Sequence, residues 1–399
     1  MRCLRGGVAA WLCGVCGVAL GASVTVSSGG ELLAALANCS TSIDVSLSGG
    51  ALVSLDRTAA LSGPECAATV DGSSAGAEAP AVVRSASGAR LFAVDGGASL
   101  VLRNVSMTGC AEAEGDGGCV RAAGGGAVVL AACRATGNAA RNGSGGVAHV
   151  QGARSSLAVV GGAYVANAAA AHGGAFAAAG GASLAVIGGA RVEANVAGAG
   201  GGALAVVGGA AATIAEGAAF ANSTTSGDGG AVFVGGAAAS LAVADASFRG
   251  HGAARRGAVV YSEGRVNVSG GHFFGDNAAA TDAFAYVAGT EAFVVTGGVF
   301  DCGAAWDGVA ALCAGADVAW GVVGPGAGAA LRVGGDWCLV PAWSRHGAGA
   351  FAVADGAASR GAGHGRLIHR RFNVLEKRLP REAHGTLWVR PERRSLVQK

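Results

Sequence analysis

Apolar residues in the middle of the chain alternate with small or polar residues in short segments, and these segments return at a fixed interval. Alternation with a period of two is typical of a β-strand that buries one face. Each interval holds three such segments, which predicts three short strands per repeat. The first segments contain Leu204 and Val206, Val232 and Val234, and Val259 and Tyr261; the second contain Leu157 and Val159, Leu184 and Val186, Leu241 and Val243, and Val266 and Val268; the third end near Val165, Val192, Phe220, Phe248 and Phe273.

Glycine fixes the length of the repeat. The second residue of a Gly-Gly pair recurs at intervals of 28 residues, and a single glycine, Gly257, follows after 27. Glycine adopts positive φ without steric cost, so it suits a chain that must turn between three strands within so few residues. The recurring glycines are Gly118, Gly146, Gly174, Gly202 and Gly230.

The pattern predicts an all-β parallel β-helix in which each repeat of about 28 residues forms one coil. A single coil cannot bury its apolar face alone, so stacked coils share one core. Asparagine recurs about twenty residues after each repeat glycine, where it tolerates a left-handed turn and can bond to the asparagine above. We therefore expect Asn167, Asn195 and Asn222 to form one file, and the glycines another. The recurring asparagines are Asn138, Asn167, Asn195, Asn222 and Asn277.

The repeat resembles that of bacterial polymorphic outer membrane proteins, in which G-G-A and an apolar residue are followed by F-x-x-N. The first half matches at Gly173–Phe176, Gly201–Leu204 and Gly229–Val232, and the second half at Tyr164–Asn167, Val192–Asn195 and Phe274–Asn277. The resemblance covers about 117–277. It implies a right-handed, pectin-lyase-like β-helix displayed outside a cell, with adhesion as its role. The membrane β-barrel that ends such proteins has no counterpart after Phe300.

The chain begins with the three parts of a signal peptide, which we assign to residues 1–22. Arg2 and Arg5 precede an apolar run from Gly6 to Leu20, and the small residues Gly21 and Ala22 follow. A buried or membrane-anchoring first helix is the alternative, although the run is short for a bilayer.

The remainder divides into a β-helix over residues 23–335, with its clearest repeat at 117–277, and an irregular region over 336–399. A short helical stretch from Glu31 to Asn38 predicts an N-terminal cap, which would cover the open core and strand edge of the first coil. From Arg360 onward, 11 Lys or Arg face 3 Glu. This basic tail is either a disordered extension that binds acidic glycans or the product of a mis-joined gene model.

The composition further narrows the class of protein to which the chain can belong. Glycine supplies 73 residues and charged residues only 14%, without a G-X-Y period, which excludes collagen and charged disorder. Removal of the signal peptide would leave eight cysteines, a number that suits disulfides in an exported chain. The expected pairs are Cys39 with Cys66 and Cys302 with Cys313. Five N-x-S/T sequons suggest a glycoprotein if the source is eukaryotic, at Asn38, Asn104, Asn142, Asn222 and Asn267.

Candidate chemistry is sparse. Two G-H-G triplets, at His251 and His364, are similar to the triplet of polygalacturonases but lack the carboxylate partners that this chemistry needs. One group of charged residues falls within about one coil and is interpreted mainly as solvated surface charge: Asp228, Asp245, Arg249, His251, Arg255 and Arg256. The GDGG segments at Asp116 and Asp228 are similar to calcium-binding repeats but are not consecutive.

No catalytic, cofactor-binding or metal-binding residue is therefore assigned, and no cofactor is expected. The leading hypothesis is a non-enzymatic, extracellular or cell-surface β-helix protein that binds glycans or cell-surface proteins, or mediates adhesion. A pectate-lyase-like or other polysaccharide-degrading enzyme is the alternative. We expect a secreted monomer, or an envelope protein if the source is bacterial, with no nucleic-acid partner and no integral membrane domain in the mature chain.

Overall fold

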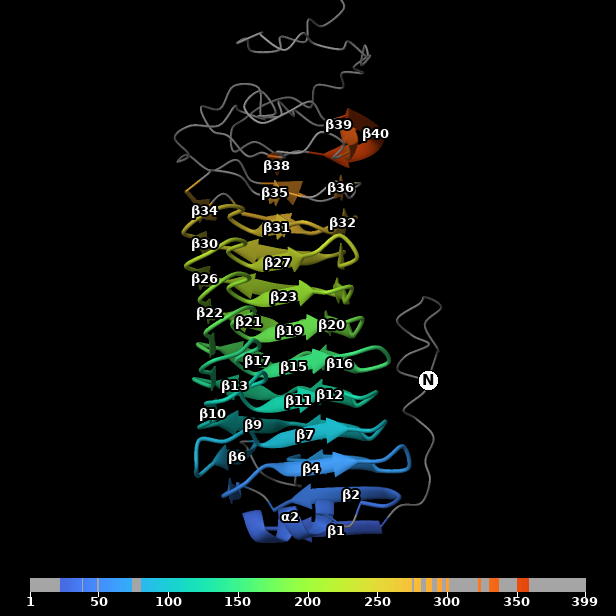
Figure 1. Cartoon of the computed structure of the whole chain (residues 1–399), viewed down its shortest axis with the longest axis vertical. Helices are drawn as coiled ribbons and strands as arrows, with labels where there is room; N and C mark the ends of the chain where they lie inside the picture. Colours follow the sequence, from blue (N-terminus) through green and yellow to red (C-terminus); the bar gives the residue numbers. More distant parts are fainter. Residues whose placement is uncertain are drawn as a thin grey trace, which may run out of the picture.

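The chain folds into a parallel β-solenoid whose coils stack along one long axis (Figure 1). The computed structural model describes residues 22–37, 39–48, 50–73, 80–274, 276–280 and 285–288, and the strand residues 293–295, 299–300, 322–323, 330–336 and 350–358. All strand pairs in these residues are parallel, and each strand pairs with its equivalents in the neighbouring coils. The all-β solenoid expected from the sequence is confirmed.

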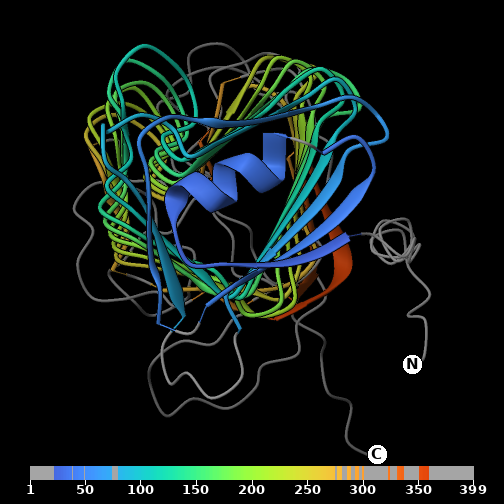
Figure 2. The same cartoon turned by 90° about the horizontal axis from the view of Figure 1, so that it is seen from below.

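Three long sheets form the walls of the solenoid, as the view along its axis shows (Figure 2). Sheet A has 13 strands: β1 (Ala22–Val26), β2 (Ser42–Leu47), β5 (Ala67–Asp71), β8 (Ser99–Arg103), β12 (Ala127–Ala131), β16 (Ser156–Val160), β20 (Ser183–Ile187), β24 (Ala211–Ile214), β28 (Ser240–Val243), β32 (Arg265–Val268), β36 (Phe293–Val295), β39 (Ala330–Asp336) and β40 (Ala350–Ala358).

Sheets B and C have 10 strands each. Sheet B consists of β3 (Leu52–Leu55), β6 (Ala81–Ser85), β9 (Val105–Thr108), β13 (Arg134–Thr136), β17 (Ala163–Val165), β21 (Arg191–Glu193), β25 (Ala218–Ala221), β29 (Ala246–Arg249), β33 (His272–Phe273) and β37 (Val299–Phe300). Sheet C consists of β4 (Ala59–Ser62), β7 (Phe92–Asp95), β11 (Val120–Ala122), β15 (Ala148–Gln151), β19 (Phe176–Ala179), β23 (Leu204–Val207), β27 (Val232–Gly235), β31 (Val260–Ser262), β35 (Ala285–Val287) and β38 (Val322–Val323).

A fourth sheet, which the sequence did not predict, adds a two-residue strand to most coils. Sheet D has 7 strands: β10 (Ala111–Glu112), β14 (Ala139–Ala140), β18 (Ala168–Ala169), β22 (Val196–Ala197), β26 (Thr224–Thr225), β30 (Gly252–Ala253) and β34 (Ala278–Ala279). Two residues are too few to show an alternating pattern, so the expectation of three strands per coil was incomplete.

The strand register confirms one coil per repeat. Leu204 lies beside Val232, which follows it by 28 residues. The glycine file is also confirmed, because the backbone N–H of Gly174 donates to Gly201 at 3.2 Å and that of Gly202 to Gly229 at 3.2 Å. A Cβ atom on Gly202 would overlap the carbonyl oxygen of Gly230 in the next coil, so this close approach of backbones requires glycine.

Three details of the predicted phase were wrong by one residue. Val260, not Val259, pairs with Val232, so Tyr261 points outward beside Phe233. In the third strand Tyr164, not Val165, pairs with Val192 and fills the core. Gly257 has φ of 68° and occupies the place of Gly229, the first glycine of its pair, so this step also spans 28 residues. Runs of small apolar residues have no polar neighbour to set the phase of the alternation.

A continuous polar ladder runs through the inside of the solenoid at the start of sheet D. In each coil a backbone N–H donates to a buried side chain of the next coil, with donor–acceptor distances between 2.8 and 3.4 Å. Asparagine amide groups also donate to carbonyl groups in the preceding coil, as Asn195 does to Tyr164 at 3.0 Å. The ladder begins at the backbone of Cys110 and continues through Asn138, Asn167, Asn195, Ser223, His251 and Asn277.

The predicted asparagine file was therefore wrong at one position. Asn222 is exposed with φ of 53°, and its neighbour Ser223 takes the rung. The left-handed residue of each coil precedes the rung, since Ala166 and Ala194 have φ of 55° and 53°. The rung and the left-handed turn are thus two separate positions. Asparagine forms the rung in some coils, whereas Asn222 is the turn residue of its coil.

The described residues contain one helix, α2 (Gly29–Ala37), which lies across the first coil in Figure 2. Ser28 and Glu31 form a capping box: Glu31 Oε2 accepts from the backbone of Ser28 at 3.2 Å, and Ser28 Oγ accepts from the backbone of Glu31 at 3.3 Å. Leu32 and Leu36 of this helix are buried in the core that the solenoid shares.

Two disulfides join cysteines near the start of the solenoid. Cys39 is bonded to Cys66, as expected from the sequence, and Cys110 is bonded to Cys119, which was not expected. Cys133 is buried with a free thiol, and burial raises its pKa to about 12. The expected pair Cys302 and Cys313 lies outside the described residues, as do most of the signal peptide and the basic tail.

Candidate functional site

Polar and charged residues form a file in the turns that lead into sheet C. Six positions follow one another at 28-residue steps, one per coil: Asp116, Ser144, His172, Gly200, Asp228 and Arg256. Contacts between coils connect them: Asp116 Oδ1 accepts from the backbone of Ser144 at 2.7 Å, and parallel bridges join His172 to Gly200 and Gly200 to Asp228. We call these residues the turn file.

A second file lies beside the turn file, on the outer face of sheet C. Its members are set by the strand register and run from charged residues through alanine to aromatic residues: Arg121, His149, Ala177, Ala205, Phe233, Tyr261 and Tyr286. The two files together are called the sheet C strip. Its two ends carry different chemistry.

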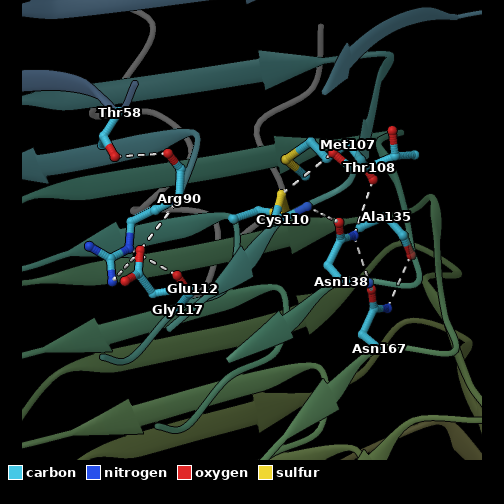
Figure 3. The surroundings of a disulfide bond; sticks show 11 residues. Thr58, Arg90, Met107, Thr108, Cys110, Glu112, Gly117, Ala135, Asn138 and Asn167 are labelled. Atoms are coloured by element: carbon cyan, nitrogen blue, oxygen red, sulfur yellow. Dashed lines mark hydrogen bonds and ion pairs between the residues drawn. A yellow bond between two sulfur atoms is a disulfide. The ribbon is translucent and has the colours of Figure 1, made fainter. Parts of the chain in front are cut away.

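At the N-terminal end, the strip holds a charged network around Arg90 (Figure 3). The Arg90 guanidinium donates to the carbonyl oxygens of Asp116 at 2.6 Å and Gly117 at 2.9 Å and lies 3.6 Å from Glu112. Burial lowers the pKa of Arg90, and Glu112 opposes this shift. His149 Nε2 lies 3.9 Å from Asp116; burial lowers the pKa of His149, with Asp116 acting in the opposite direction.

At the C-terminal end, the strip holds stacked aromatic rings and a bidentate ion pair. Arg256 donates to both oxygens of Asp228, at 2.8 and 2.9 Å, and Arg255 approaches the same carboxylate at 3.9 Å. The Arg256 guanidinium also lies 4.8 Å from the ring centres of Tyr261 and Tyr286. The hydrogen bonds to Asp228 raise the pKa of Arg256, while burial raises that of Tyr261 to about 12. This geometry combines a charge-assisted fork with cation–π contact.

The middle of the strip depends on Gly200. The rings of His172 and Phe233 stack with their centres 4.7 Å apart, although the two residues come from coils on either side of Gly200. A Cβ atom on Gly200 would lie 2.8 Å from the Phe233 ring. Because Gly200 has no side chain, the two rings have the space to stack on each other. Phe233 then continues the stack to Tyr261 at 5.2 Å.

The structure brings together only part of the charged group that the sequence placed within one coil. Asp228, Arg255 and Arg256 meet in the sheet C strip, whereas Arg249 pairs with Asp276 at 3.2 Å on sheet B. His251 does not reach this surface: it is 1% exposed and forms a rung of the polar ladder. The interpretation of this group as solvated surface charge was therefore wrong for His251, which is a buried residue in the turn between β29 and β30.

The remaining candidates, Asp245 and the two GDGG aspartates, lie apart from one another. Asp245 lies in the exposed turn between β28 and β29, with φ of 51°. The GDGG aspartates Asp116 and Asp228 belong to one file but lie four coils apart, so they do not meet. In the part of the chain that the structure describes, no three His, Cys, Asp or Glu residues are placed to hold a metal ion. His364 lies outside the described residues.

The pattern of apolar positions along the sequence did not reveal the aromatic members of the strip. Phe233, Tyr261 and Tyr286 follow at steps of 28 and 25 residues, and this spacing was the available signal. This spacing was hidden because Tyr261 was assigned to the inward face.

Comparisons with known proteins add no assignment: neither protein-family models, nor curated proteins, nor solved structures gave a match to this chain. Among the described helices and strands, no helix is long and apolar enough to span a membrane.

Proposed function

We propose that this protein is an extracellular or cell-surface β-helix that binds a glycan or a cell-surface protein along the sheet C strip, without catalysing a reaction on it. The observation that carries this proposal is the register of the strip, which stacks Phe233, Tyr261 and Tyr286 in three successive coils with Arg256 against the two tyrosine rings. Extended files of this kind are how solenoid proteins build long binding surfaces. Aromatic and arginine side chains are also the residue types enriched where binding energy concentrates.

The accessible part of the strip lies beside its aromatic stack. The Arg255 side chain is 64% exposed, and Arg256 is 28% exposed while being held in place by Asp228. A bound anionic or hydroxyl-rich ligand would meet a fixed guanidinium at Arg256 and a more exposed one at Arg255. Fixing one donor in advance lowers the entropy cost of binding.

The proposal includes several finer features. We infer a right-handed winding from the resemblance to polymorphic outer membrane protein repeats, together with export through a signal peptide over residues 1–22. We also infer that α2 acts as the N-terminal cap, which the burial of Leu32 and Leu36 supports. Asn142, Asn222 and Asn267 are exposed, so these sequons are accessible for glycosylation in a eukaryotic secretory pathway.

The test is a binding screen of the full-length, secreted protein against a glycan array and a panel of cell-surface proteins, followed by two charge reversals. Arg255→Glu changes the sheet C strip, and Arg191→Glu is its matched control on sheet B, because Arg191 is 62% exposed and also has an acidic partner. We expect Arg255→Glu to weaken binding at least tenfold and Arg191→Glu to leave it within twofold.

Equal effects of the two reversals would refute the sheet C strip as the binding surface. A parallel assay with uronic-acid polymers and calcium addresses the alternative of a polysaccharide-degrading enzyme. Robust turnover of any polymer in that assay would replace the binding proposal.

A further inference from the structure

The outer face of sheet B carries arginine on every second strand. In sheet order, β6, β13, β21 and β29 each present one arginine outward, whereas β9, β17 and β25 between them contain no charged residue. All four arginines are exposed. We call them the arginine row: Arg84, Arg134, Arg191 and Arg249.

The strand register sets the spacing of the arginine row. Arg134 and Arg191 occupy the same outward position two strands apart, since both pair with Ala163 of β17. Arg84 and Arg249 occupy the other outward position and continue the two-strand step at either end. The row therefore offers one guanidinium about every 9.6 Å, two strand separations, over about 29 Å of the solenoid axis.

The arginine row makes this face basic although the body of the chain is acidic. Before residue 360 the chain carries 17 basic and 23 acidic residues. The strands of sheet B from β3 to β33 reverse this balance, since they contain the four arginines and one acidic residue, Glu193. A negatively charged ligand is therefore favoured on this face.

The four guanidinium groups differ in their neighbours. Arg191 and Arg249 each donate to an acidic side chain, at 2.7 and 3.2 Å. Arg84 and Arg134 have no acidic partner in the part of the chain that the structure describes, and Arg84 donates to the hydroxyl of Ser54 at 3.3 Å. The positive charge open to a ligand is therefore greatest at Arg84 and Arg134.

We propose that the arginine row binds a linear acidic polysaccharide that carries one carboxylate on every second sugar and lies along the solenoid axis. Two sugars of an extended chain span about the same distance as two strands, about 9.6 Å, so successive carboxylates meet successive arginines. Small outward residues on the intervening strands, such as Ala163 and Ala219, leave room for the uncharged sugars.

The spacing favours this ligand over nucleic acid, whose phosphates follow one another at about 3.4 Å along each strand of a duplex. A denser polyanion would place charges over the uncharged strands, where no arginine pairs with them. The arginine row lies on a different sheet from the sheet C strip, and the inference does not rest on the strip.

Binding of a hyaluronan octasaccharide to the purified full-length protein tests the row, because this polymer carries one carboxylate per two sugars. By calorimetry in low salt we expect a dissociation constant on the order of 0.1–1 mM, since each exposed ion pair contributes little. Arg134→Glu should weaken binding at least fivefold, and the octasaccharide with its carboxylates reduced to alcohols should not bind. Arg255→Glu, the same change of charge on the sheet C strip, should leave the affinity within twofold.

A second variant tests the spacing at constant net charge. Arg134→Ala combined with Ala163→Arg moves one guanidinium by a single strand, about 4.8 Å, and should weaken octasaccharide binding at least threefold. Circular dichroism checks that each variant folds, and Arg84→Glu replaces Arg134→Glu if that variant does not.

Four results would each overturn the proposal: wild type that does not bind the octasaccharide at about 1 mM, an Arg134→Glu variant that binds like wild type, a shifted variant that binds like wild type, or tighter binding of duplex DNA of equal length. A ligand from the glycan array that responds to Arg255→Glu alone belongs to the sheet C strip, and one that responds to Arg134→Glu alone belongs to the arginine row. The two proposals therefore fail independently.

Discussion

Acid should weaken this solenoid through one rung of its polar ladder, His251. The Nδ1 atom of His251 accepts a hydrogen bond from the backbone of Ser223 at 3.2 Å, so the imidazole must be neutral in the folded chain. Protonation of Nδ1 would turn this acceptor into a second donor facing a backbone N–H. His251 is fully buried, and its Nε2 atom has no hydrogen-bond partner in the described part of the chain.

The size of the effect follows from the shift of the His251 pKa. Burial lowers this pKa from 6.5 to about 4, and the backbone of Phe220, the backbone of Ser223 and the Asp276 carboxylate oppose the shift only in part. A histidine with a lowered folded-state pKa contributes its full stability above the unfolded-state pKa and loses it as pH falls toward the folded-state pKa. Between pH 7 and pH 4 the loss is about 3 kcal/mol.

The matched variant is His251→Asn, because asparagine forms this rung in the next coil, at Asn277, and in three earlier coils. By analogy with Asn195, which donates to Tyr164 31 residues earlier, the new amide would donate to the carbonyl of Phe220. The free energy of unfolding should be measured by urea denaturation for both proteins at several pH values between 7 and 4. Other titrating groups, including His149 and His172, contribute equally to both proteins and cancel in the difference.

We expect the stability of His251→Asn relative to wild type to rise by about 3 kcal/mol across this range. A difference that stays constant within about 0.5 kcal/mol from pH 7 to pH 4 would refute the neutral acceptor role of His251. A variant of lower stability at every pH but with the same pH slope as wild type would lead to the same conclusion.

Three other outcomes follow from the structure. Asn167→Ala should cost about 3 kcal/mol of unfolding free energy, because it leaves buried backbone and amide groups without partners, whereas Asn222→Gly, outside the ladder, should change stability by less than about 0.5 kcal/mol. Asp228→Asn should cost about 2 kcal/mol by breaking the fork to the half-buried Arg256, while Arg255→Ala should stay within about 0.5 kcal/mol; thermal or urea unfolding of each variant measures both. The Cys133 thiol should react with iodoacetamide only after denaturation, and mass spectrometry of the native protein showing its rapid alkylation would contradict its burial.

The sequence by itself determined the class of the fold and the length of its coil. Gly202 illustrates why: backbones of adjacent coils approach so closely there that a Cβ atom would overlap a carbonyl oxygen, and five successive coils carry glycine at this phase, from Gly118 to Gly230. That requirement repeats at 28 residues and can be read without coordinates. The pairing of Cys39 with Cys66 was also accessible, since both cysteines flank the first strands and helix.

Only the tertiary structure decided which side each residue of a short strand faces and which residues meet between coils. Val259 and Val260 are both apolar, so a one-residue slip left the pattern unchanged while it moved Tyr261 from the inward face to the stack with Phe233. Asn222 and Ser223 are both good turn residues, and only the position of the backbone N–H of Asn195 selects Ser223 as the rung. Alternation along one strand is a local property, whereas the sheet C strip and the polar ladder are formed by residues that the stacking of coils brings together from far apart in the sequence.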